Sequence, residues 1–349
     1  MAELHVVQYE KLRSFCASLM EKEGLTKEDA FTCADNLVDA DLCGVESHGV
    51  SRLSNYLKRL HTGVVSHKKA IKIVREYPGS VSVDGGNEMG MIVGKFTMNK
   101  CIEKAKENGC CFGTAFHSNH YGMASYYARI ATEQGLIGIT GTNAPPNIAP
   151  WGSSKKYVGT NPIAIGVPTG GKPIILDMAP SVVAMGKIIL AAKLGKKIPE
   201  GWVLDSNGKP TTDPVVGQYG TLIPIGGPKG SGMAVMMEIF CAFLAGAASG
   251  PYINNFWKDF ENPQNVGQIF MALDISKFTD KDTFFDRIDN FVKETKALPK
   301  SPGVKEIYLP GELEFDRRES RKKDGLEIAD SIYQELVSLS EKYGVSISF

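Results

Sequence analysis

The chain has 349 residues, 43% of them apolar and 22% charged, so it can bury a large core and has the composition of an ordinary globular protein. Lysine plus arginine equals aspartate plus glutamate at 39 each. This balance argues against nucleic acid or an anionic membrane as the main partner. The seven cysteines lack CxxC spacing, which indicates reduced thiols in a cytoplasmic protein rather than disulfides or a zinc site.

Nothing in the sequence predicts export or membrane insertion. Residues 1–10 lack the apolar stretch of a secretory signal. The longest apolar run, residues 233–248, is interrupted by Glu238 and Gly246 and is too short to cross a bilayer. We therefore expect a cytoplasmic protein.

The first 65 residues show helical periodicity. Thr26 is a good N-cap with Asp29 three residues later, and apolar residues then recur at helical spacing as far as Ala40. The same spacing returns from Leu53 to Leu60, so a junction between two helices is expected over residues 46–52.

The middle of the chain alternates between strand and helix patterns. Strands are expected over 71–74, 81–83, 110–116, 136–140, 163–167, 174–178, 268–274 and 307–309. Helices are expected over 92–108, 123–133, 180–190, a fully buried 230–244, an amphipathic 282–296 and a closing 326–339. Residues 195–225 are rich in Gly, Pro, Asp and Thr and predict an extended surface loop. The simplest architecture joins both chain ends into a helical domain beside an α/β domain, with an active-site cleft between them.

Several residues with reactive or ligand-binding side chains lie close together in the run Glu46-Ser47-His48-Gly49-Val50-Ser51-Arg52. Histidine exchanges protons near neutral pH, and arginine grips a carboxylate through two parallel hydrogen bonds. These are the groups needed to handle a small 2-oxo or 2-hydroxy acid. The alternative for His48 is a helix-end histidine that bonds a backbone carbonyl.

A second run, His117-Ser118-Asn119-His120-Tyr121-Gly122, supplies two more histidines. His117 and His120 could share a metal, which would suit a metal hydrolase. No Asp, Glu or Cys lies at ligand spacing nearby, so we expect no metal site.

Neither a GxGxxG motif after a strand nor a GxxxxGK[ST] motif is present. Residues 226–232, GGPKGSG, form a glycine-rich turn before a predicted helix, where free N–H groups, the helix dipole and Lys229 would favour a phosphate. An ordinary turn is the alternative. Asp177 ends a strand, where it would orient a ligand or cap the next helix, and Pro310-Gly311-Glu312 is a turn by composition.

Taken together, these motifs resemble the type-2 malate/L-lactate dehydrogenase family, which includes ureidoglycolate dehydrogenase, diketogulonate reductase, sulfolactate dehydrogenase and piperideine-carboxylate reductase. The matching runs occur in family order: ADLCGVESHGVSRL (40–53), HSNHYG (117–122), GTNPIAIGVP (159–168), ILDMAPS (175–181), IPEGW (198–202), GPKGSGM (227–233) and LPGE (309–312). Ser231 departs from the family, where an aromatic residue is usual.

The resemblance implies a non-Rossmann α/β fold. It consists of an NAD(P)-binding domain over residues 76–312, with a largely antiparallel central sheet, and a helical domain over 1–75 plus 313–349. It also implies a homodimer. The activity implied is hydride transfer between NAD or NADP and a small 2-hydroxy or 2-oxo acid, of malate or L-lactate type or ureidoglycolate. Reduction of a cyclic imino acid and a non-catalytic ligand-binding relative are the alternatives.

The resemblance also implies roles for individual residues. His120 is the proton-transfer residue and also a cofactor contact, with His48 and Ser47 beside it and Arg52 clamping the substrate carboxylate. The remaining cofactor contacts implied are Thr142, Asp177, Met178, Ala179, Lys229, Pro310, Gly311 and Glu312. His117 is often another residue in relatives and receives no role. Sequence reasoning alone does not separate His48 from His120 as the acid/base.

Overall fold

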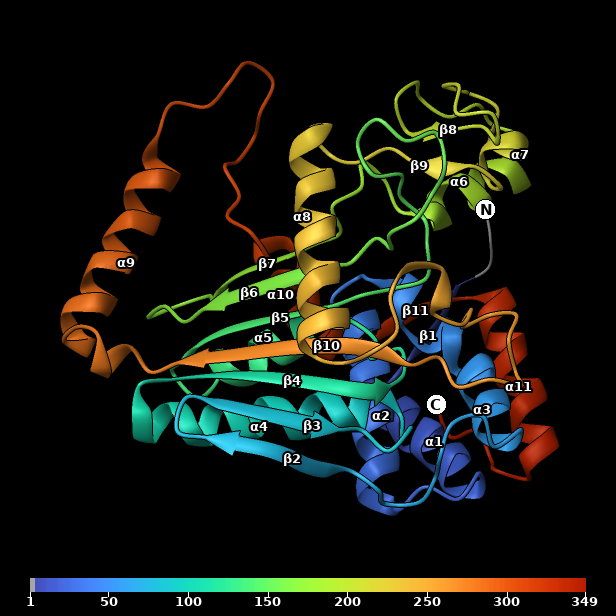
Figure 1. Cartoon of the computed structure of the whole chain (residues 1–349), viewed down its shortest axis with the longest axis horizontal. Helices are drawn as coiled ribbons and strands as arrows, with labels where there is room; N and C mark the ends of the chain where they lie inside the picture. Colours follow the sequence, from blue (N-terminus) through green and yellow to red (C-terminus); the bar gives the residue numbers. More distant parts are fainter. Residues whose placement is uncertain (1–3) are drawn as a thin grey trace.

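The computed structural model describes residues 4–349. Its centre is a seven-stranded sheet in the order β2-β3-β4-β10-β5-β6-β7 (Figure 1). The strands are β2 Lys72–Tyr77, β3 Ser80–Asp84, β4 Cys110–Ser118, β5 Ile137–Thr142, β6 Ile163–Val167, β7 Ile174–Met178 and β10 Val266–Leu273. Among these neighbours β3 and β4 run parallel and the other pairs antiparallel. The predicted fold class, α/β with a largely antiparallel sheet, is confirmed.

Helices cover both faces of this sheet (Figure 1). On one face α4 Gly90–Asn108 packs against β4 and β10, and α5 Ser125–Thr132 packs against β5 and β6. On the other face lies α8 Pro228–Glu238, which continues as a π-helical stretch, Ile239–Leu244. The sequence predicted that this helix is fully buried, and that prediction is wrong because it packs on the sheet by one side only. Exposed apolar residues on the other side are Met233, Met236, Ile239, Phe243 and Leu244.

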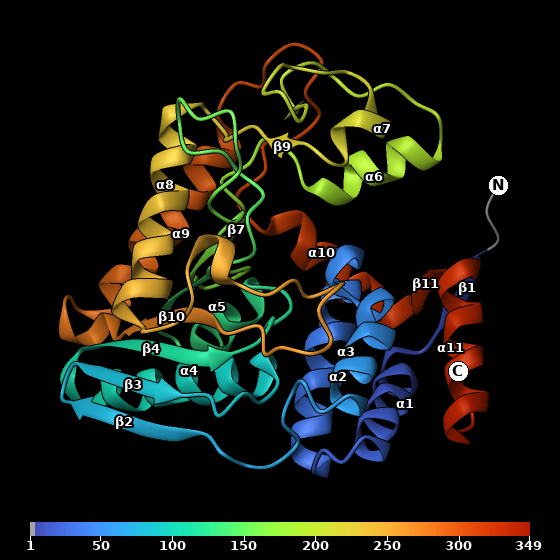
Figure 2. The same ribbon diagram turned by 45° about the vertical axis from the view of Figure 1, so that its right-hand side comes forward.

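The two ends of the chain meet beside the sheet (Figure 2). α1 Tyr9–Lys22, α2 Lys27–Leu42 and α3 Leu53–His61 come from the N-terminal part, and α10 Glu312–Asp324 and α11 Asp330–Tyr343 from the C-terminal part. β1 Leu4–Val7 pairs antiparallel with β11 Leu326–Ala329. Residues 326–329 were expected to begin the closing helix, but Leu326 and Ile328 are buried while Glu327 between them is exposed, which is strand periodicity. The predicted N-cap is confirmed, since Thr26 accepts a hydrogen bond from the Asp29 N–H at 3.3 Å.

Residues 180–225 form a small layer beyond the sheet edge (Figure 2). It contains α6 Met185–Lys193, α7 Pro214–Gly217 and the paired strands β8 Val203–Leu204 and β9 Thr221–Leu222. The helix expected from Pro180 starts at Met185, because Ser181 is still extended and bridges Pro224. The expected surface loop is packed, since Val203 and Leu222 are fully buried in it.

Two further segments complete the chain. α9 Lys281–Ala297 projects from the body, as Figure 1 shows, and has no buried residue. The strand expected at residues 307–309 is absent from the described structure; instead the Pro310 carbonyl accepts one bond, from the Ile175 N–H of the edge strand β7, at 2.9 Å. Within residues 4–349 no helix is long and apolar enough to cross a membrane.

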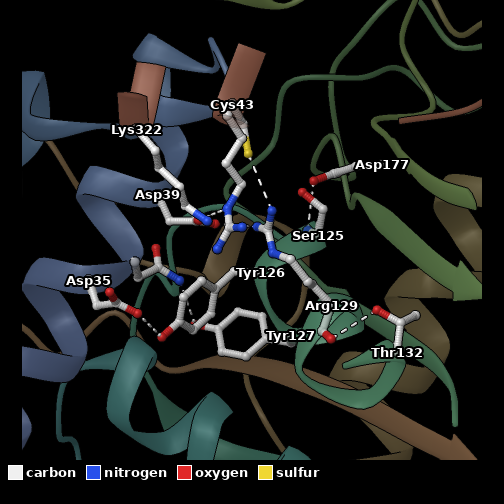
Figure 3. A network of polar contacts seen from close by, with 12 residues as sticks. Asp35, Asp39, Cys43, Ser125, Tyr126, Tyr127, Arg129, Thr132, Asp177 and Lys322 are labelled. Carbon is white, nitrogen blue, oxygen red and sulfur yellow. Dashed lines mark hydrogen bonds and ion pairs between the residues drawn. The ribbon is translucent and has the colours of Figure 1, made fainter. Parts of the chain in front are cut away.

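The division into residues 1–75 plus 313–349 and 76–312 stays a prediction. Two apolar clusters bear on it: one draws mainly on the helices at the chain ends, the other on α4, α5 and the sheet. Between them lies a buried ionic contact (Figure 3). The Asp39 carboxylate of α2, 4% exposed, accepts hydrogen bonds from Arg129 of α5 and, at 2.6 Å, from Arg318 of α10. Tyr126 of α5 adds a bond to Asp35 of α2 at 2.8 Å.

We expect Asp39→Ala to destabilise the protein by about 3–5 kcal/mol, because it leaves two guanidinium groups without their buried anion. Denaturant unfolding measures the change. Glu319→Ala is the matched control, since Glu319 pairs with the same Arg318 at 3.4 Å but at the surface, where such a pair is worth about 0–1 kcal/mol. Equal losses of unfolding free energy in the two variants would show that Asp39 does not hold α2, α5 and α10 together.

Candidate active site

The Glu46–Arg52 run lies between α2 and α3, as predicted, and folds into two 3-10 turns, Glu46–His48 and Val50–Arg52. The buried Asp41 carboxylate fixes the second turn by accepting the Val50 N–H at 2.8 Å. A Cβ on Gly49 would lie 1.8 Å from Asp41 Oδ1, so only glycine permits this contact. Burial raises the pKa of Asp41 to about 7. The turn is therefore attached firmly to α2.

These turns present His48 and Ser47 to the site. Ser47 Oγ lies 3.0 Å from His48 Nδ1, so the partner of this imidazole is a hydroxyl group and not the backbone carbonyl of the alternative interpretation. The His48 ring lies almost parallel to that of His120, with centroids 5.7 Å apart. The two histidines that the sequence singled out are thus neighbours.

His120 follows the end of β4 and is held from several sides. Its N–H donates to Gln264 Oε1 at 2.9 Å. Its Nδ1 lies 2.5 Å from the Tyr56 hydroxyl and 3.3 Å from the backbone nitrogen of Gly122. Its Nε2 has no hydrogen-bond partner among residues 4–349, so Nε2 is the nitrogen open to a substrate.

Both imidazoles are held in the neutral form. Burial, followed by the charge of Arg52, lowers the pKa of His48 from 6.5 to about 3. Burial also lowers the pKa of His120 well below its usual value, with Arg52, His48 and Arg59 acting in the same direction. A neutral imidazole near pH 7 can accept a proton.

Arg52 is a cation without an anion. Its Nε donates to the Ser47 carbonyl, and the ring of Trp257 lies 4.8 Å from its guanidinium carbon. Within the described part of the chain it forms no ion pair, and Nη1 and Nη2 carry no hydrogen bond. Burial lowers its pKa. An arginine with both Nη groups available matches a carboxylate.

The predicted cofactor segments adjoin the edge strand β7. The Ile225 N–H bonds the Pro180 carbonyl just beyond Asp177, Met178 and Ala179, four residues before Lys229. Gly311 lies so close to β7 that a Cβ there would be 2.6 Å from the Ile175 carbonyl oxygen. A cavity of about 450 Å³ borders this segment and is lined by residues that include Ile174, Leu309 and Glu312.

Several polar groups in these segments are already engaged. Asp177 accepts the Ser125 N–H at 2.7 Å, so it caps α5 and not the helix that follows it in sequence (Figure 3). Because α5 follows the His120 loop, this bond places the end of β7 beside that loop. Glu312 is bound by Lys296, and the Thr142 hydroxyl donates to the Gly267 carbonyl at 3.0 Å.

The glycine turn before α8 only partly fits the expectation. Its N–H groups were expected to be free, but those of Lys229, Gly230 and Ser231 bond to the carbonyls of Gly226, Ile225 and Gly227. Lys229 itself is exposed, and its side chain has no hydrogen bond or ion pair within residues 4–349. A cofactor phosphate fits this exposed cation at a helix start better than it fits the backbone of the turn.

His117 does not join the site. Its Nδ1 lies 3.1 Å from Asp84, and its side chain is half exposed. No group of three or more His, Cys, Asp or Glu side chains close enough to hold a metal occurs among the described residues.

Sequence reasoning missed Tyr56, Phe256, Trp257 and Gln264. Tyr56 was treated as part of an apolar helix stripe, although it lies four residues after Arg52 and thus on the same helix face. The Phe256 ring lies 4.9 Å from that of His120. The segment 254–264 has no local motif, and only the fold brings it to the site.

Comparison with known proteins identifies the family. The family model described as malate/L-lactate dehydrogenase matches residues 7–337. Malate dehydrogenase of Pyrococcus horikoshii is 40% identical over 97% of this chain and 96% of its own length. A solved structure of malate dehydrogenase from Pyrococcus horikoshii OT3 superposes with a TM-score of 0.92 at 36% identity, covering 100% of this chain and 99% of that one.

Two relatives carry a cofactor in their names. Ureidoglycolate dehydrogenase (NAD(+)) of Escherichia coli K12 is 31% identical over 95% of both chains. (2R)-3-sulfolactate dehydrogenase (NADP(+)) of Chromohalobacter salexigens is 32% identical over 95% of this chain and 97% of its own. With a family model that spans nearly the whole sequence, the chain belongs to the malate/L-lactate dehydrogenase family.

Proposed function

We propose that the protein catalyses reversible hydride transfer between NAD or NADP and C2 of a small 2-hydroxy or 2-oxo acid of the malate/L-lactate type, with ureidoglycolate among the candidates. One observation carries the proposal: an arginine without an anion, Arg52, lies beside two neutral histidines. Relatives named for malate, ureidoglycolate and sulfolactate support the same substrate class.

Arg52 binds the substrate carboxylate. The two free Nη groups form parallel hydrogen bonds to its oxygens, which fixes the direction of C2 as well as its position. Such alignment of the reacting atoms lowers the activation barrier by roughly several kcal/mol. The bound carboxylate also supplies the negative charge that the Arg52 guanidinium lacks.

His120 transfers the proton. In oxidation its Nε2 accepts the proton of the C2 hydroxyl, and in reduction the same nitrogen returns it to the oxygen. Nε2 is free to accept only when the single proton of the neutral ring lies on Nδ1, and the Tyr56 hydroxyl oxygen can accept that N–H before and after the transfer. His48, with Ser47 on its Nδ1, is the second candidate for this role.

NAD or NADP would lie along β7. When bound, the cofactor would supply the hydride acceptor for oxidation and the hydride donor for reduction. Thr142, Asp177, Met178, Ala179, Pro310, Gly311 and Glu312 would contact it, and His120 would contact both it and the substrate. Lys229 would bind a phosphate oxygen through its ammonium group.

A homodimer is part of the proposal. The exposed apolar side of α8 and the following π-helical stretch, which includes Ile239, Phe243 and Leu244, supports it, because soluble monomers rarely leave such a patch uncovered. We expect a solution mass of twice the 37.9 kDa of one chain by light scattering. A mass of 37.9 kDa at micromolar concentration would remove the dimer from the proposal.

The direct test is the loss of NADH or NADPH absorbance with a panel of 2-oxo acids and one cyclic imino acid. Turnover with a 2-oxo acid supports the proposal and identifies substrate and cofactor together. Turnover with the imino acid alone would assign a reductase of that class. Tight binding of reduced cofactor without turnover of any compound would favour a ligand-binding relative.

We expect His120→Ala to lower kcat by about two to four orders of magnitude, the usual contribution of general acid–base catalysis. His117→Asn is the matched control, because His117 is exposed, lies outside the site and has a left-handed φ of +46° that asparagine tolerates. Near-normal turnover of His120→Ala would transfer the proton role to His48.

Stability should depend on pH through His48. Its folded pKa of about 3 lies below the ordinary 6.5, so between these values the unfolded chain binds more protons than the folded one. The stability that the neutral form of His48 contributes is fully present above pH 6.5 and is lost as the pH falls toward 3.

We therefore expect the thermal midpoint to fall from pH 7 to pH 5 and to fall less in His48→Gln, which does not titrate. His67→Gln, at an exposed histidine outside the site, should follow the wild type. An identical pH dependence in wild type and His48→Gln would mean that His48 is not held neutral by the fold.

A further inference from the structure

We propose that Trp257 is a positioning residue for substrate binding and that it holds the Arg52 guanidinium in the orientation that meets the substrate carboxylate. The inference rests on the proposed function, in which Arg52 binds the substrate carboxylate. Trp257 comes from the segment between the π-helical stretch and β10, far from Arg52 in sequence, and its ring lies 4.8 Å from the Arg52 guanidinium carbon. No other aromatic ring lies over Arg52 in the described structure.

Two restraints of different kind act on this guanidinium. The bond from Nε to the Ser47 carbonyl holds one N–H of the group and leaves rotation about that bond open. The ring of Trp257, 4.8 Å from the guanidinium carbon, adds a cation–π attraction that this rotation would disturb. Together they leave Nη1 and Nη2 as the edge that meets a carboxylate, already oriented before substrate arrives.

Trp257 is itself held by the helix that follows Arg52. Arg59, fully buried in α3, donates through Nη1 to the carbonyls of Phe256 at 3.2 Å and Asp259 at 2.7 Å. Asn55 of α3 adds a bond to the Phe256 carbonyl at 3.0 Å. Residues 52, 55 and 59 share one face of this helix, so the element that begins at the clamp also fixes the segment that carries its stacking partner.

The Trp257 side chain is anchored less than its backbone. It is 50% exposed, while the preceding Phe256 is 4% exposed and packs edge-on against it at 5.1 Å. The Trp257 N–H is bound to Asn255 Oδ1 at 2.9 Å. Removing the indole therefore takes away the stacking partner of Arg52 and leaves the buried core of the segment in place.

We expect Trp257→Ala to raise KM for the 2-oxo acid about tenfold, as loss of a partly desolvated cation–π contact predicts. KM for the reduced cofactor should not change, and kcat should change less than KM, because the clamp holds the carboxylate in both ground and transition states. Trp257→Phe keeps an aromatic face and should recover most of the affinity. Lys258→Ala is the matched control, since Lys258 is the next exposed residue of the same segment.

A double-mutant cycle separates positioning from a general structural role. In an Arg52→Ala background, Trp257→Ala should cost less than about twofold in affinity, since it acts through Arg52. Equal losses in both backgrounds would overturn the inference, as would an unchanged affinity in Trp257→Ala alone. The thermal midpoint of each variant, compared with that of wild type, shows whether unfolding contributes to the loss of affinity.

Oxalate binding to the reduced-cofactor complex, measured by calorimetry, decides the inference without turnover. We expect oxalate to bind wild type and Trp257→Phe with similar affinity, to bind Trp257→Ala about tenfold more weakly, and to bind Arg52→Ala more weakly still. Failure of the proposed function appears differently, as absence of turnover with every acid while these differences in oxalate binding persist. Equal oxalate affinity in wild type and Trp257→Ala would overturn the role of Trp257.

Discussion

The site depends on one unbalanced charge. Arg52 is held among uncharged groups, with the Ser47 carbonyl bonded to Nε and the Trp257 ring 4.8 Å from its guanidinium carbon, and no carboxylate in the described structure neutralises it. An ionised group in such surroundings is costly unless something else compensates it. The same charge reaches the histidines, where it adds to burial in lowering the pKa of both His48 and His120. In the proposed function, substrate binding and proton transfer therefore share one electrostatic cause.

The geometry of the site depends on contacts that join distant parts of the chain. Asp39 binds Arg129 and Arg318 and so joins α2 to α5 and α10. Arg59 binds the carbonyls of residues 256 and 259, and so joins α3 to the segment that leads into β10. In each case a buried arginine or carboxylate connects elements that are far apart in the sequence, by 90 residues for Asp39 and Arg129 and by 279 for Asp39 and Arg318. Such contacts are specific in direction, which apolar packing alone is not.

Some helices and strands were predicted correctly from the sequence and others were not, for physical reasons. The strands at 163–167 and 174–178 were correct because continuous apolar runs between turn residues have few alternatives. Residues 326–329 were assigned to a helix because their pairing partner, residues 4–7, lies at the other end of the chain. The helix over 230–244 was expected to be buried, since its composition does not show which side faces the sheet.

The site residues divide in the same way, into those that a local sequence pattern reveals and those that only the fold brings together. Ser47, His48, Arg52 and His120 were found because their spacing and chemistry are visible locally. Tyr56 was hidden in a helical apolar pattern, and Trp257 stands in a segment without any motif. The contacts that orient the reacting groups come from outside the motifs that contain them. A motif thus identifies which groups can react, whereas the fold determines how they are aimed.

A carboxylate at Arg52 would change the proton chemistry beside it. Its negative charge offsets the guanidinium charge, which is one of the causes of the low pKa values of His48 and His120. The imidazoles of the free protein are therefore poorer proton acceptors than those of the substrate complex. A 2-hydroxy compound without a carboxylate would form no ion pair with Arg52. It would also leave the pKa values of both imidazoles as low as in the free protein. Discrimination against such compounds would then appear in the chemical step as well as in binding, because in the proposed function the same arginine acts on both.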